Sequence, residues 1–183
     1  MSLSLTSKET SLLKDQQNHE KVCIQKYQTY ASQASDPALQ QLLSNYAQQE
    51  QQHLNTLNQI LNGQVPAMSS SSSQSNAQNF AQSSTTTSSA LSSQGMSNQA
   101  SGMQNSVISS SSQGVTNSQS DSALCNDMLM TEKYVSGAYD TAIFEFKDPA
   151  VRQALNHIQK EEQQHGEGLF QYMENNGMYN PGS

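Results

Sequence analysis

The sequence repeats itself, because residues 20–61 match residues 132–173 at a constant offset of 112 positions without gaps. The clearest correspondences are Asp36-Pro37-Ala38 with Asp148-Pro149-Ala150, and Glu50-Gln51-Gln52-His53 with Glu162-Gln163-Gln164-His165. Corresponding residues of an internal repeat are expected to adopt the same local structure, so the repeat limits the possible folds. The chain is therefore expected to fold from two similar halves.

Each half is predicted to form two helices joined by a short turn. Asp36-Pro37 and Asp148-Pro149 each place an N-cap acid before a proline at the first helical position. They should therefore end one helix and begin the next. The other expected helix ends are a capping box at Thr6 and Glu9, a cap at Ser120-Asp121-Ser122 for the third helix, and stops at Gly63 and Gly177.

Residues 64–122 separate the halves and have a different composition. They are 59 residues, 22 of them Ser, with Asp121 as the only charge. Such a segment buries too little apolar surface to order itself, so we predict a disordered Ser/Gln/Asn-rich crossover. A flexible chain of this length spans roughly 42 Å, which exceeds the length of about 38 Å of a 25-residue helix. The segment is therefore long enough to cross the length of a bundle and connect one helical hairpin to the other.

Apolar residues recur at alternating steps of four and three in all four predicted helices, as in the seam of a packed bundle. The expected fold is therefore all-α: one four-helix bundle domain. It consists of a first hairpin at residues 1–63, the crossover at 64–122 and a second hairpin at 123–183. One long crossover between two hairpins is the topology of ferritin-like folds.

Six polar residues interrupt the apolar stripes, although a buried carboxylate without a partner costs several kcal/mol. Glu20 lies 16 residues before Asp36, which is about 24 Å along its helix. Glu50 and His53 lie 14 and 17 residues after Asp36, which is about 21 and 26 Å along the next helix. The constant offset repeats this arithmetic in the second half. The side chains expected to meet in one layer are Glu20, Glu50, His53, Glu132, Glu162 and His165.

One Glu from each of two helices, with Glu-x-x-His from each of the other two, is the ligand set of carboxylate-bridged dinuclear sites. Four carboxylates neutralise two divalent cations, and each metal receives one imidazole nitrogen. We therefore predict two divalent metal ions, either iron or manganese. The alternative is a metal-free buried Glu–His network. Tyr27 and Tyr139 lie two turns beyond Glu20 and Glu132, where they are either hydrogen-bond partners of the ligands or core tyrosines.

Composition excludes other function classes. The formal charge is −7 with only eight Lys and Arg, which argues against a nucleic-acid partner. No apolar run is long enough for a membrane span, and the N-terminus lacks the pattern of a secretory signal, so synthesis in the cytoplasm is expected. Cys23 and Cys125 are expected to be reduced core residues rather than a disulfide.

The C-terminal 60 residues resemble the spore coat protein F (Coat F) family. The resemblance is carried by Asn126-Asp127-Met128-Leu129, Glu132-Lys133, Asp148-Pro149 and Gly177-Met178-Tyr179-Asn180-Pro181. It implies a spore coat component located in the coat, with other coat proteins or a second copy of the chain as partners.

The ligand pattern is similar to that of the ferritin-like superfamily of bacterioferritins, rubrerythrins and manganese catalases. This second resemblance implies the six residues above as metal ligands. It also implies an alternative function as a dinuclear oxidoreductase acting on peroxide, dioxygen or ferrous ion, through catalase, peroxidase or ferroxidase chemistry. No catalytic residue and no organic cofactor site is predicted.

Overall fold

The computed structural model describes residues 3–64 and 109–179, with side chains from residue 120 onward in the second range. Within these ranges the chain is all-helical and contains no strand. The four helices are α1 (Ser7–Gln33), α2 (Pro37–Leu61), α3 (Ser109–Ile143) and α4 (Pro149–Asn175). Most of the predicted crossover, residues 65–108, lies outside the described part of the chain.

Local capping signals place most helix ends where the sequence predicts them. Thr6 and Glu9 form a complete capping box at the start of α1. Asp36 and Asp148 accept hydrogen bonds from the first backbone N–H groups of α2 and α4, each ahead of a proline. Gly63 and Gly177 follow α2 and α4 with φ of 80° and 66°, a conformation that favours glycine.

The predicted start of α3 is wrong. The helix begins at Ser109, so Ser120-Asp121-Ser122 lies inside it rather than at its cap. Asp121 instead accepts hydrogen bonds from the backbone N–H groups of Ser35 (2.8 Å) and Asp36 (3.0 Å) in the α1–α2 turn. An acid that satisfies the turn of another hairpin looks the same in the sequence as one that caps its own helix.

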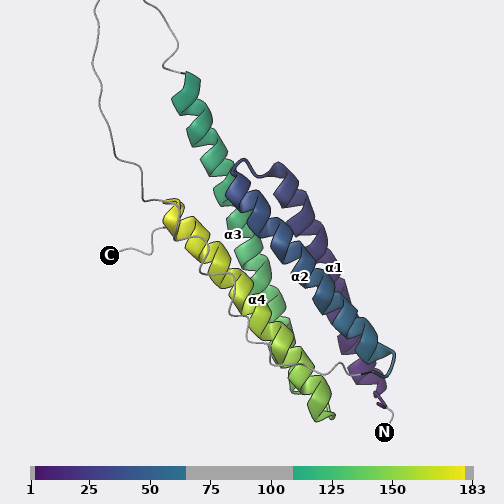
Figure 1. Cartoon of the computed structure of the whole chain (residues 1–183). Coiled ribbons are helices and arrows are strands. Elements are labelled where there is room, and N and C mark those ends of the chain that lie inside the picture. Colours follow the sequence, from purple (N-terminus) through teal and green to yellow (C-terminus); the bar gives the residue numbers. More distant parts are fainter. Residues whose placement is uncertain (1–2, 65–108, 180–183) are drawn as a thin grey trace, which may run out of the picture.

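The helices form two antiparallel hairpins that pack against each other in a helical bundle (Figure 1). Helix α1 contacts α2 and α3, and α4 contacts α3 and α2. Apolar residues from all four helices join one buried cluster, in which Leu13, Leu57, Met128 and Leu155 are fully buried. Each such side chain stabilises the fold by about 1.5–3 kcal/mol relative to its exposed state.

Helix α2 ends at the opposite end of the bundle from the α1–α2 turn, whereas α3 enters the bundle beside that turn. Gly63 lies beside Leu3 in the segment before α1, whereas Asp121 of α3 contacts the turn at Ser35 and Asp36. Helices α2 and α3 therefore point in the same direction (Figure 1).

Two further findings concern features expected from the sequence. Cys23 and Cys125 are free thiols in the buried core, as predicted. No helix in the described ranges has the length and apolar character needed to cross a membrane.

Candidate metal centre

The six polar residues of the apolar stripes are all buried in the interior of the bundle. Their exposed fractions do not exceed 2%, although four of them are carboxylic acids. Each helix of the bundle contributes: Glu20 from α1, Glu50 and His53 from α2, Glu132 from α3, and Glu162 and His165 from α4. The structure therefore brings all six into one layer.

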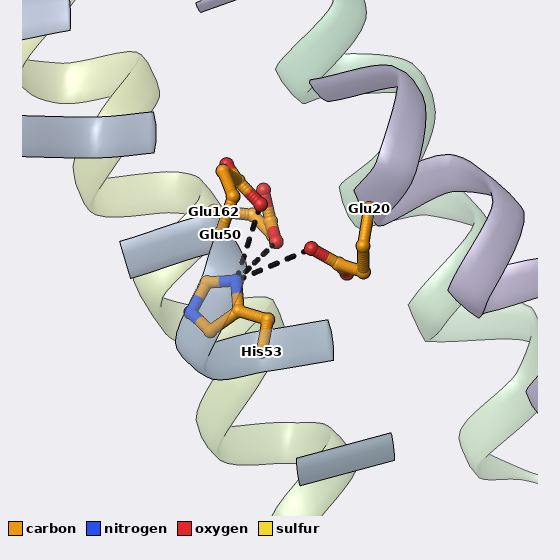
Figure 2. Close-up of side chains that lie close together, drawn as sticks. All are labelled: Glu20, Glu50, His53 and Glu162. Atoms are coloured by element: carbon orange, nitrogen blue, oxygen red, sulfur yellow. Dashed lines mark hydrogen bonds and ion pairs between the residues drawn. The ribbon is translucent and has the colours of Figure 1, made fainter. Parts of the chain in front are cut away.

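Three carboxylates surround the inner ring nitrogen of His53 (Figure 2). His53 Nδ1 lies 3.0 Å from Glu162 Oε1, 3.3 Å from Glu50 Oε2 and 3.5 Å from Glu20 Oε2. A single N–H group cannot serve three acceptors at these distances. The four side chains form a compact group of oxygen and nitrogen donors that could hold one cation.

A second group surrounds His165 and is the counterpart of the first at the 112-residue offset. His165 Nδ1 lies 3.0 Å from Glu50 Oε1 and 3.9 Å from oxygens of both Glu132 and Glu162. In each group, one donor atom from every residue lies within 4.8 Å of the others. Glu50 and Glu162 belong to both groups, which is the arrangement expected of two bridging carboxylates.

The outer ring nitrogen of each histidine has a hydrogen-bond partner on the other hairpin. His53 Nε2 lies 2.9 Å from Glu161 Oε2, and His165 Nε2 lies 2.9 Å from Gln49 Oε1. Both partners are acceptors, so each Nε2 carries a proton. When Nδ1 is deprotonated, this arrangement leaves its lone pair directed to the interior, where it could bind a metal ion.

Sequence reasoning missed both of these partners. Glu161 stands directly before Glu162 and received no role from the sequence, but it is partly buried against His53. Gln49 and Glu161 correspond at the 112-residue offset, and each directly precedes the glutamate of a Glu-x-x-His motif. That paired polar position was the available signal, but it does not reveal which helix the side chain contacts.

Tyr27 and Tyr139 each donate a hydrogen bond to a glutamate of the opposite hairpin. The Tyr27 hydroxyl donates to Glu132, and the Tyr139 hydroxyl donates to Glu20. Burial, followed by the nearby carboxylates, holds the pKa of both phenols well above the ordinary value, so both remain donors. Each tyrosine thereby fixes one oxygen of a candidate ligand and leaves the other oxygen free.

Burial dominates the electrostatics of the layer. It raises the pKa of Glu20 to about 8 and that of Glu162 to about 7, and it raises the pKa of Glu132 well above its usual range. Burial also opposes ionisation of Glu50, but hydrogen bonds from His165 and His53 outweigh it and lower the Glu50 pKa. The metal-free centre therefore retains protons on several carboxylates near neutral pH.

His53 has the opposite balance. Burial alone lowers the pKa of its imidazole, but the hydrogen bond to Glu161 and the nearby carboxylates of Glu162, Glu20 and Glu50 raise it well above the ordinary value. A proton on His53 thus offsets part of the negative charge in the metal-free centre. A bound cation would replace this proton.

Several buried carboxylate oxygens accept no hydrogen bond, which provides a test of whether a metal fits. They are Glu20 Oε2, Glu132 Oε2 and both oxygens of Glu162. Glu162 Oε1 lies 3.0 Å from His53 Nδ1, but the pair does not have hydrogen-bond geometry. Unpartnered buried oxygens are costly, and two divalent cations would satisfy all four. The residues present therefore fit a dinuclear metal site.

The surroundings of the two histidines differ in one further respect. The Tyr46 ring lies 4.4 Å from the His165 ring, centroid to centroid, whereas the residue that corresponds to Tyr46 at the 112-residue offset is the aliphatic Ile158. Tyr46 fits there because α4 carries glycine at position 168: a Cβ atom on Gly168 would lie 1.8 Å from the Tyr46 hydroxyl oxygen.

Comparison with known proteins gives one family match. Residues 120–182 match the family model described as the Coat F domain, a stretch of 63 of the 183 residues. The match contains Glu132, Glu162 and His165 and excludes the other three candidate ligands. It supports the predicted resemblance to the spore coat F family. No curated protein and no solved structure matches the chain.

Proposed function

We propose that the chain is a spore coat protein whose ferritin-like four-helix bundle binds a dinuclear iron or manganese centre. The observation that carries the proposal is the sharing of Glu50 and Glu162 between two His-centred donor groups in the core. Two cations held by these groups would neutralise the four buried glutamates. No lysine or arginine performs that role, because the buried residues in the described part of the chain include neither.

The Coat F match supports the spore coat part of the proposal. The location is then the spore coat, and the partners are other coat proteins or further copies of this chain. The match covers the second hairpin, and the first hairpin is linked to it by the sequence repeat.

Recurring contacts support a ferritin-like fold made of two duplicated hairpins. The Tyr27–Glu132 bond corresponds to Tyr139–Glu20 at the 112-residue offset. The bond from the Lys147 N–H group to Glu9 likewise corresponds to the bond from the Ser35 N–H group to Asp121. Contacts that recur between halves are expected when two copies of one hairpin pack about an approximate two-fold axis.

In this proposal the chain's residues divide the work of holding the metals. Glu50 and Glu162 would contribute to both ions, Glu20 and Glu132 would each hold one ion, and each histidine would supply Nδ1. Bound iron or manganese supplies Lewis-acid and redox chemistry. Tyr27 and Tyr139 orient Glu132 and Glu20 through their hydrogen bonds, and the apolar core excludes bulk water from the layer.

The second candidate function is a dinuclear oxidoreductase that acts on peroxide, dioxygen or ferrous ion. It is favoured by the donor count, because each group offers four residues while iron and manganese commonly accept six ligands. Open positions on each ion would admit a small oxidant. The two functions are compatible, because a coat layer can contain an enzyme that removes peroxide.

The test is the metal content of the full chain, purified after expression with both iron and manganese available. We expect about two metal ions per chain in the native protein, as the two donor groups require. The double variant Glu50→Gln/Glu162→Gln, which removes both shared carboxylates, should contain none. Glu174→Gln, at an exposed position of α4, is the matched control and should bind as the native chain does. A metal-free native preparation would exclude the dinuclear site.

Activity assays then separate the two functions. Peroxide disproportionation or ferroxidase turnover by the metal-loaded native chain, lost in the double variant, would establish the oxidoreductase. Two metal ions per chain with neither activity would favour a structural or storage role in the coat.

A further inference from the structure

The two donor groups are nearly equivalent, but one polar contact breaks the equivalence. The glutamates, histidines and hydrogen-bonding tyrosines of one half all recur in the other half at the 112-residue offset. The residue that contacts the outer nitrogen of each histidine does not recur. It is the carboxylate Glu161 beside His53 and the neutral amide Gln49 beside His165.

These two contacts share their geometry and differ in charge. Each joins Nε2 of a histidine to a side-chain oxygen at 2.9 Å, and each crosses between α2 and α4. The Glu161 side chain is 24% exposed, and its Oε2 atom also lies 3.5 Å from His157 Nε2. Gln49 corresponds to Glu161 at the offset, so the chain carries an internal comparison of carboxylate with amide at one position.

The charge difference acts on the metal through the imidazole. A carboxylate that accepts the Nε2–H bond polarises the ring and makes Nδ1 a stronger donor than an amide oxygen does. The carboxylate also adds a negative charge close to the cation, in surroundings where charges are weakly screened. Outer partners of this type typically change metal affinity by 10–100-fold.

We propose that the two metal positions differ in affinity, and that the position formed by Glu20, Glu50, His53 and Glu162 fills first. Glu161 is the positioning residue that sets the order, through His53. The inference rests on the proposed dinuclear site. It implies that a half-loaded chain is a defined species, with one ion next to His53 and an empty position next to His165.

The experiment is a titration of the metal-free full chain with Mn²⁺ alone. Calorimetry measures the binding steps, and electron paramagnetic resonance records the state of the bound Mn²⁺. The native chain should bind in two steps whose affinities differ by about 10-fold or more. At one equivalent the spectrum should be that of isolated Mn²⁺, and at two equivalents that of a coupled pair. Glu161→Gln should weaken the first step by about 10–100-fold and bring the two steps together. Gln49→Glu should strengthen the second step by a similar factor.

These substitutions are matched, because each installs the residue that the other half already carries. Ligand variants assign the steps: Glu20→Gln should remove the tighter step, and Glu132→Gln should remove the weaker one. The inference is overturned if Glu161→Gln leaves both steps unchanged, if the native chain fills both positions in one step, or if Glu132→Gln removes the tighter step. If the native chain binds no Mn²⁺ at all, the dinuclear site itself fails, which is a different result.

Discussion

The hydroxyl of Tyr139 on α3 donates a hydrogen bond to Glu20 on α1, in the opposite hairpin. Its counterpart Tyr27 on α1 makes the same bond to Glu132 on α3. Each hairpin therefore orients a candidate ligand of the other. An isolated hairpin would lack the partner of its glutamate, one residue of one donor group and three residues of the other.

Replacing Tyr139 with Phe should weaken metal binding at the position that contains Glu20. The variant keeps the ring in the core but removes the hydroxyl that orients this glutamate, and losing such a partner typically costs 10–100-fold in affinity. Competition with a chelator for Mn²⁺ measures the change. Tyr30→Phe is the control, because that hydroxyl donates to Asp127 near the surface. Native affinity in Tyr139→Phe would show that the hydrogen bond does not orient Glu20 for binding.

Replacing Gly168 with Ala should destabilise the fold by about 1–3 kcal/mol, the usual range for an overpacked core. The new Cβ atom would lie 1.8 Å from the Tyr46 hydroxyl oxygen and 3.1 Å from Cζ. Chemical denaturation measures the change. Gly137→Ala is the matched control: nothing lies within 4 Å of its Cβ position, and alanine should stabilise that helix by up to about 1 kcal/mol. Adding Tyr46→Phe to Gly168→Ala should recover part of the loss, and no recovery would mean that the tyrosine is not the obstacle.

Most helix ends and the height of the polar layer were predictable because their signals are local or arithmetic. Asp36-Pro37 and Asp148-Pro149 specify a cap and a fixed backbone angle within two residues. The constant rise of a helix then places Glu20 level with Glu50 and His53 once the turn position is known.

The contacts that cross between hairpins were not predictable in this way. Asp121 was interpreted as a cap of its own helix and Glu161 was given no partner, yet both bond to the other hairpin. Periodicity shows which face of a helix is buried, but the identity of the partner depends on how each helix is rotated against its neighbours. Asp121 is buried four residues before Cys125 on the apolar stripe of α3, whereas Glu161 is partly exposed beside the stripe of α4, where a small rotation decides between solvent and neighbour.

Replacing Glu9 with Gln should lower stability at neutral pH by about 1 kcal/mol, because the two carboxylate oxygens accept from the backbone N–H groups of Thr6 and Lys147 and an amide offers one acceptor oxygen only. Burial opposes ionisation of Glu9, but the backbone N–H groups of Lys147 and Thr6 outweigh it, so its pKa lies below the ordinary value of 4.5. A carboxylate with a lowered pKa stabilises the fold above the unfolded-state pKa and loses this effect as the pH falls through the folded-state pKa. The stability difference between native and Glu9→Gln should therefore be full above about pH 5 and shrink in more acidic solution, as measured by denaturation at several pH values. Asp15→Asn, at an exposed site of α1, should show little effect at any pH.

The metal-free centre should have the reverse pH dependence. Burial raises the pKa of Glu162 to about 7 and that of Glu20 to about 8, from an ordinary value of 4.5, and it also raises the pKa of Glu132 well above that value. The folded chain therefore holds protons that the unfolded chain has released. Hydrogen bonds to carboxylates also raise the pKa of His53, which extends the effect above pH 6.5. The lowered pKa of Glu50 contributes a constant amount to the stability between about pH 5 and 8.

Chelator-treated protein should consequently lose stability as the pH rises from 5 to 8, by about 1.4 kcal/mol per pH unit for each extra proton that the folded state holds. Saturating Mn²⁺ should reverse the trend, because the cations replace these protons and bind more tightly as the carboxylates ionise. Denaturation of both forms across this range measures the two slopes. Glu20→Gln/Glu162→Gln should flatten the slope of the metal-free form, since an amide has no proton to release. A metal-free chain whose stability rises with pH would mean that the buried glutamates are ionised in the folded state without a cation.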